Sequence, residues 1–180
     1  MKFTKGILAT LFVISCGSNN PSSISSQDQF PTMPDDSMTP GSLCSRPTER
    51  RYPEQIAYCK RNVASQTKRN IIRTYDETFG YQIESMNRAE FKIDHLIPLC
   101  MGGSNEVDNL WPQHSSVYMH TDLLEQRLCE IMARGELHQA KAVEVIRQAK
   151  HDFDFADRLR DALQSNSSMD EEDIDAMQRN

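Results

Sequence analysis

The stretch that decides the fold, FKIDHLIPLCMGGSNEVDNLWPQ, spans residues 91–113. Apolar and polar residues alternate at its start, which predicts a short strand that ends by Pro98, since proline cannot donate a ladder hydrogen bond. Gly102-Gly103-Ser104-Asn105 predicts a turn. Residues 107–111 then predict a second extended segment, stopped by Pro112. The result is a hairpin with Asp94 and His95 on one arm and Asn109 on the other.

The chemistry of this hairpin follows from its geometry. Adjacent strand residues point to opposite faces, so Asp94 and His95 cannot form a Ser-His-Asp type relay. At a strand end the carboxylate can face a hard cation while the imidazole faces a water that it deprotonates. The pair therefore suits metal-assisted hydrolysis.

Helical patterns surround the hairpin. Residues 114–137 predict a helix capped by Ser115 or Ser116 and ended by Gly135. Residues 66–79, followed by Gly80, predict another helix, and residues 136–150 and 153–163 predict two more. The expected order at the centre is therefore strand, strand, helix.

The central motif resembles the HNH (ββα-metal) nucleases. Asp94-His95, Ile97-Pro98-Leu99, Gly102-Gly103, Asn105 and Asn109-Leu110-Trp111-Pro112 match most closely a group of secreted or lipoprotein bacterial HNH-like proteins built around DHLIPLxxGGSNxxxNLWPQ. A weaker likeness extends from about residue 44 to about residue 150. The resemblance implies an α+β fold: a small ββα-metal core, a two-stranded hairpin plus a helix, surrounded by additional helices.

The same resemblance implies an activity, the hydrolysis of phosphodiester bonds in DNA or RNA with little sequence specificity. Asp94 and His120 would hold one divalent ion, expected to be Mg²⁺, with His114 as the alternative ligand. His95 would act as general base on water, and Asn109 would orient the loop that carries His95. Cys100 stands where this group carries an acidic residue.

The N-terminus predicts export. Lys2 and Lys5 precede a short apolar run that ends in Val-Ile-Ser-Cys, the pattern of a lipoprotein signal peptide over residues 1–15, with lipid attached to Cys16. The host's outer membrane, where there is one, is the expected destination. Residues 16–42 are polar and predict a disordered tether. Residues 43–164 would form the HNH-like domain, and residues 165–180 an acidic, disordered tail.

The remaining cysteines are Cys44, Cys59, Cys100 and Cys129, an even number in an exported chain. They predict two disulfides, for which three pairings exist, and we favour Cys44 with Cys59 and Cys100 with Cys129. A structural zinc site is the alternative, but no Cys-x-x-Cys pair is present.

Charge is unevenly distributed. The chain has a formal net charge of −6, but residues 46–73 carry eight Lys and Arg against two Glu. A local basic face is what binding to a phosphate backbone needs. The residues expected to contact nucleic acid, DNA above all, are Arg50, Arg51, Arg69 and Arg73. Residues 43–164 have the length of one domain, and we expect a monomer.

Two other functions fit the same sequence. A catalytically inactive surface lipoprotein could use this scaffold to bind nucleic acid or a protein partner. A structural envelope lipoprotein would have no ligand, and a lone histidine near a strand is more often structural than catalytic. Metal-dependent plasmid cleavage that His95→Ala abolishes would distinguish the nuclease from both.

Overall fold

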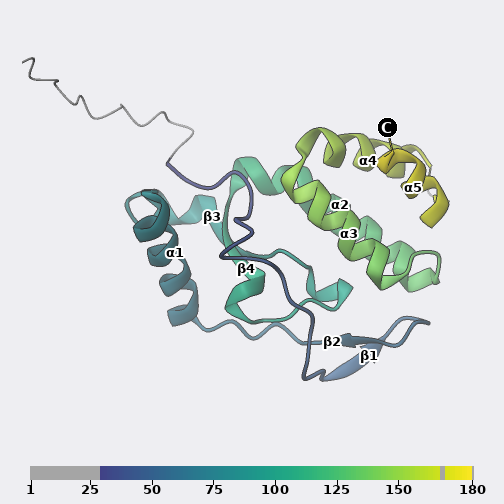
Figure 1. Ribbon diagram of the computed structural model, residues 1–180, viewed down its shortest axis with the longest axis horizontal. Coiled ribbons are helices and arrows are strands. Elements are labelled where there is room, and N and C mark those ends of the chain that lie inside the picture. The colour runs from purple at the N-terminus through teal and green to yellow at the C-terminus, as the bar shows by residue number, and fades with distance from the viewer. Residues whose placement is uncertain (1–28, 167–168, 180) are drawn as a thin grey trace, which may run out of the picture.

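The computed structural model describes residues 29–166 and 169–179, and within them it is an α+β fold (Figure 1). The described residues form two antiparallel hairpins and five α-helices, joined by loops and short 3₁₀ turns. In chain order they are β1 (Glu49–Arg51), β2 (Ile56–Tyr58), α1 (Ser65–Phe79), β3 (Phe91–His95), β4 (Leu110–His114), α2 (Ser115–Arg134), α3 (Gln139–His151), α4 (Phe153–Ser165) and α5 (Glu171–Gln178).

The predicted central order of two strands and a helix is confirmed. β3 pairs with β4 in an antiparallel hairpin that places Asp94 opposite Trp111, and α2 begins directly after β4. Helix α1 lies on one side of this hairpin and α2–α5 on the other (Figure 1). The hairpin therefore separates two apolar clusters, one under α1 around Trp111 and Tyr75, and one within α2–α5 around Leu128 and Phe155.

Pro112 does not stop the second strand, which continues to His114. The amide of Leu96 donates to the carbonyl of Asn109, so this pair is hydrogen-bonded across the hairpin. Antiparallel pairs alternate in type, which puts the pair of Ile93 and Pro112 among the non-hydrogen-bonded ones. A proline is tolerated there because no ladder bond is required of its nitrogen.

The structure corrects the expectation that residues 16–42 form a disordered tether, for the part that it describes. Thr39 is fully buried and its hydroxyl lies 2.7 Å from that of Tyr75, while the Phe30 ring stacks on His114 at 4.2 Å. Residues 29–42 thus pack against α1 and the end of β4 through these contacts. The predicted signal peptide and the lipidated Cys16 lie outside the described residues.

The acidic tail also differs from the prediction, because residues 171–178 form a helix rather than a disordered segment. Asp170 caps α5 through a capping box, and Ile174 is completely buried against the other helices. Glu171 lies 2.9 Å from His138 and Asp175 lies 2.5 Å from Lys141. His138 and Lys141 therefore pair with two acids of the tail, and Met169, Ile174 and Met177 pack it on the apolar cluster within α2–α5.

Both favoured disulfides are present, joining Cys44 to Cys59 and Cys100 to Cys129. Disulfides are typical of oxidising compartments outside the cytoplasm, so they indicate an extracytoplasmic domain. In the described part of the chain, no helix has the length and apolarity needed to cross a membrane.

Candidate functional site

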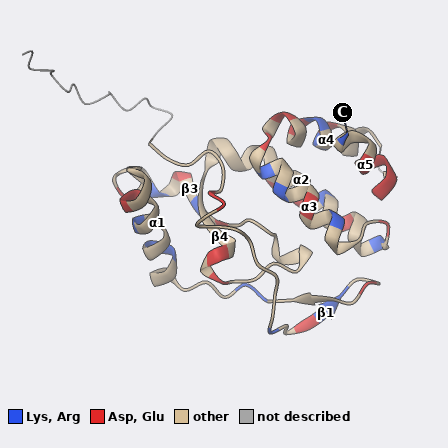
Figure 2. Ribbon diagram, in the orientation of Figure 1, with Lys and Arg blue, Asp and Glu red and all other residues tan. Residues whose placement is uncertain are grey.

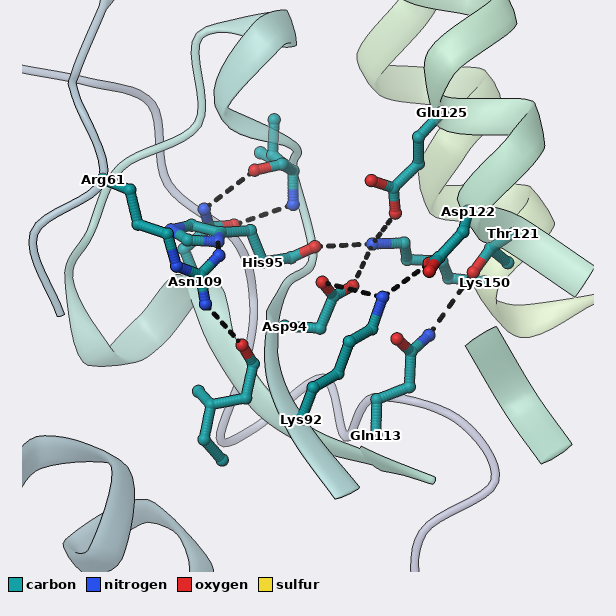
Figure 3. A network of polar contacts seen from close by, with 12 residues as sticks. Arg61, Lys92, Asp94, His95, Asn109, Gln113, Thr121, Asp122, Glu125 and Lys150 are labelled. Carbon is teal, nitrogen blue, oxygen red and sulfur yellow. Dashed lines mark hydrogen bonds and ion pairs between the residues drawn. The ribbon is translucent and has the colours of Figure 1, made fainter. Parts of the chain in front are cut away.

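Asp94 and His95 lie on strand β3 of the β3–β4 hairpin, and Asn109 lies at the end of the loop that joins its strands (Figure 3). Asp94 and His95 are both buried, and their side chains make separate sets of contacts, as strand alternation predicts. Asp94 contacts Lys150 of α3, whereas the His95 ring contacts Arg61 from the segment before α1. The two groups therefore belong to two different polar clusters.

Asn109 holds the hairpin loop in place. Its side chain is fully buried, accepts a hydrogen bond from the Ile97 amide at 2.9 Å, and donates to the carbonyls of Ile97 and Ser104 at 3.0 and 2.9 Å. Gly103 is required in the same loop, because a Cβ there would lie 1.8 Å from the Ile97 oxygen. These contacts are the ones that a loop-positioning role for Asn109 needs.

The partners of the His95 ring define its protonation state. Arg61, which can only donate, lies 3.2 Å from Nδ1 and also donates to the Ile93 carbonyl at 2.8 Å. The Asn105 oxygen lies 3.2 Å from Nε2, and the Asn105 amide group donates to the Lys60 carbonyl. These bonds assign the proton of a neutral ring to Nε2 and leave the Nδ1 lone pair facing Arg61.

Burial lowers the pKa of His95 to about 4, and the nearby Arg61 charge acts in the same direction, although the bond to Asn105 opposes them. The imidazole is therefore neutral at pH 7. Between the two pKa values, the unfolded chain binds a proton at His95 and the folded chain does not. Acidification therefore lowers the free energy of unfolding.

We accordingly expect the free energy of unfolding to fall by about 3 kcal/mol on this account as the pH drops from 6.5 to about 4. This contribution to stability is complete at pH values above the pKa of His95 in the unfolded chain. It is lost as the pH falls from that value to the pKa of His95 in the folded chain. Urea unfolding at several pH values would measure the fall. The matched control is His95→Gln, whose amide keeps an acceptor and a donor, and whose curve should be flatter; parallel curves for the two proteins would refute the assignment.

Asp94 belongs to a cluster centred on Lys150, which is fully buried (Figure 3). The Lys150 ammonium lies 2.9 Å from Asp94 Oδ2, 2.7 Å from Glu125 Oε1 of α2 and 2.5 Å from the His95 carbonyl oxygen. Burial opposes its charge, but the two carboxylates raise the pKa of Lys150 above its ordinary value. Burial would raise the pKa of Asp94, but the charges of Lys150 and Lys92 bring it below the usual range.

The predicted metal ligands do not converge in this structure. The His120 ring lies 2.9 Å from Asp157 and stacks on Phe153. His114 instead caps α2, where Ser115 or Ser116 was expected, by accepting from the Ser116 amide. No group of three or more His, Cys, Asp or Glu side chains suited to a metal ion occurs within the described residues.

The donor set thus does not fit the expected Mg²⁺ at Asp94 and His120. Asp94 Oδ2 already contacts one ammonium group, and Oδ1 lies 3.5 Å from a second one on Lys92. A divalent ion bound to this carboxylate would have to compete with two ammonium groups, of which Lys150 is fully buried, so we propose no step that uses a metal ion.

A basic pocket opens on the side of the hairpin where Arg61 contacts His95. We call it the Arg61 pocket; its volume is about 410 Å³ and it is lined by Arg46, Thr48, Cys59, Lys60, Arg61, Asn62 and Asn105. A second hollow of about 330 Å³ shares four of these residues. The lining of the Arg61 pocket holds three cations and no carboxylate. It is therefore suited to an anion.

The four arginines predicted to contact nucleic acid lie elsewhere. Arg50 and Arg51 are on β1, while Arg69 and Arg73 are on α1, and Figure 2 shows Lys and Arg along the chain between these elements. Arg51 pairs with Glu49 and stacks over Tyr58. The three cations of the Arg61 pocket belong to the basic segment 46–73, but they are not among the four arginines predicted from the sequence.

Three residues that sequence reasoning missed are Lys150, Glu125 and Asn105. Lys150 and Glu125 sit in amphipathic helices, where a charged residue normally predicts solvent exposure, and Asn105 belonged to a turn motif that explained it fully. No local pattern marks these residues. Scans against protein-family models and searches of curated proteins and of solved structures found no match to this chain.

Proposed function

We propose that the protein binds the phosphodiester backbone of nucleic acid in the Arg61 pocket and hydrolyses it as an HNH-like endonuclease. The observation that supports this most is that the ring of a buried histidine, His95, contacts Arg61, one of the three cations that line the pocket. Neutralising phosphates releases condensed counterions, so such a lining favours nucleic acid without regard to sequence.

The chemistry that we propose begins with Arg61. A bound phosphate competes for its guanidinium group, because a bidentate bond to an anion is stronger than one to a neutral ring nitrogen. When Arg61 turns to the phosphate, the Nδ1 lone pair of His95 becomes free to accept a proton from an attacking water. The water oxygen bonds to phosphorus as the bond from phosphorus to the 3′ oxygen breaks, and the departing 3′ oxygen takes up a proton from solvent while His95 later releases its own. Arg46 and Lys60 would stabilise the negative charge that develops on the phosphate oxygens.

Binding without hydrolysis is the second candidate, and one observation favours it. Asp94 is held by Lys150 and Lys92, so the carboxylate is committed to a structural network rather than to a catalytic ion. In both candidates we propose that the lipid at Cys16 holds the domain at the outer membrane, where the host has one.

Nucleic-acid binding is tested by fluorescence anisotropy with a labelled DNA duplex over a range of salt concentrations. We expect Arg46→Ala/Lys60→Ala to lower the affinity by about tenfold or more and to reduce the salt slope by about 2, because two phosphate contacts are lost. Arg127→Ala/Arg134→Ala, on α2, is the matched control and should bind normally. Arg69→Ala/Arg73→Ala tests the arginines predicted from sequence.

Hydrolysis is tested by plasmid nicking with Mg²⁺ and with chelator. Under the proposal His95→Ala keeps its DNA affinity but loses nicking by a factor of about 10² to 10⁴, the usual contribution of a general base. Normal binding without nicking in any buffer would leave the second candidate. Absence of salt-dependent binding would exclude both.

A further inference from the structure

Three oxygen atoms converge on the Lys150 ammonium group. They come from two elements, Asp94 and the His95 carbonyl from β3 and Glu125 from α2, and Lys150 reaches them from α3 (Figure 3). All three lie within 2.9 Å of Nζ, which carries three N–H donors. Hydrogen bonds join Nζ to Asp94 and to the His95 carbonyl, Glu125 adds an ion pair, and the lysine side chain is fully buried.

The surroundings hold more acceptors than this one cation uses. Asp122 lies 2.5 Å from Lys92, which also lies 3.5 Å from Asp94. Gln113 pairs with Lys92 across the hairpin, and its buried Oε1 accepts no hydrogen bond from any residue that the structure describes. Carboxylate, carbonyl and amide oxygens are the donors that hard divalent cations prefer. The cluster thus has the composition of a cation site, with an ammonium group inside it.

We propose that Lys150 is a built-in cation: its ammonium group fills a divalent-cation site formed by Asp94, Glu125 and the His95 carbonyl. The native protein then needs no metal ion at this position, and a hard divalent ion can bind there only after the lysine is removed. This inference concerns the cluster around Lys150 and does not depend on whether the protein cleaves nucleic acid.

The test is a rescue experiment on the full chain with Lys150→Ala, which leaves both carboxylates and opens the space that the side chain filled. We expect a large fall in melting temperature without metal. Mn²⁺ or Ca²⁺ at roughly 100 times its Kd should then raise the melting temperature by about 5 to 10 °C. A small alkylammonium ion should also stabilise this variant, because it replaces the missing group.

Two proteins serve as controls. The wild type should shift by no more than about 1 °C with either metal, because the site is already filled. Lys150→Ala/Asp94→Asn/Glu125→Gln has the same space but no carboxylates, so neither metal should stabilise it. Ion-induced stabilisation of all three proteins alike would be a general salt effect and would overturn the inference.

Direct binding provides the second measurement. Free Mn²⁺, followed by electron paramagnetic resonance, should be depleted by Lys150→Ala at one ion per chain and left unchanged by the wild type. Should Lys150→Ala fail to fold, Lys150→Gln keeps a donor for Asp94 and is titrated in its place. Wild-type binding of Mn²⁺ that Asp94→Asn abolishes, or no binding by either variant, would show that the ammonium group does not stand in for a metal ion.

Discussion

Replacing Lys150 with methionine should lower the free energy of unfolding by about 3–5 kcal/mol, the usual cost of breaking a buried ion pair from one side. Methionine is close to lysine in length, so the loss comes from charge rather than from a cavity. Asp94 and Glu125 lose the ammonium group between them, and the Lys92 ammonium, 3.5 Å from Asp94, compensates in part for Asp94 alone. Urea unfolding at pH 7 measures the change.

Two comparisons make this prediction specific. Lys141→Met, on the same helix but with its ammonium group paired to Asp175 at the edge of α5, should cost about 1 kcal/mol or less. Adding Asp94→Asn and Glu125→Gln to Lys150→Met should restore much of the stability, because the neutral cluster needs no cation. A loss below about 1 kcal/mol for Lys150→Met would mean that water reaches the carboxylates.

The cost of Lys150→Met should also shrink as the pH falls. Burial raises the pKa of Glu125 to about 7 even beside Lys150. Without the lysine, burial and mutual repulsion raise the folded-state pKa values of Asp94 and Glu125 further, above their unfolded values. A carboxyl group with a raised folded pKa takes up its proton more readily in the folded chain, so acidification stabilises the variant relative to pH 7. Repeating the urea series at pH 5 should therefore show a smaller difference from the wild type.

Asn109→Ala should lower the free energy of unfolding by about 3–5 kcal/mol, since it removes all three side-chain bonds of a fully buried amide. The Ile97 amide and two carbonyls would then lose a partner inside the loop. Because Ile97 lies two residues after His95, we expect the His95 ring to lose its fixed position as well.

Asn70→Ala is the matched control, because Asn70 is exposed on α1 and should change stability by about 0.5 kcal/mol or less. Urea unfolding of the two variants gives the comparison. The prediction for Asn109 is wrong if the two variants lose similar, small amounts. The NMR signal of the His95 ring in the Asn109 variant would report separately whether the ring has been freed.

Much of the fold could be predicted because its signals are local. Gly80 and Gly135 end α1 and α2 in the left-handed conformation, as a glycine after an apolar helical pattern predicts. Alternation and the Gly-Gly turn predicted the hairpin, and the four cysteines pair as favoured. The errors at residues 29–42 and the acidic tail arose where packing against a distant element outweighed a local preference. The error at Pro112 arose because the register of the hairpin requires no ladder bond from its nitrogen.

By itself, the sequence determined the hairpin, the helices and the divergence of Asp94 from His95, since these depend on side-chain periodicity and turn residues a few positions apart. Only the tertiary structure decided what each of these two groups faces. Lys150 is 56 residues from Asp94, and Arg61 is 34 residues from His95. Lys150 contacts the hairpin because α3 packs beside it, and Arg61 does so because the chain passes the hairpin before it enters α1. Sequence patterns over a short window cannot predict contacts between residues so far apart in the chain.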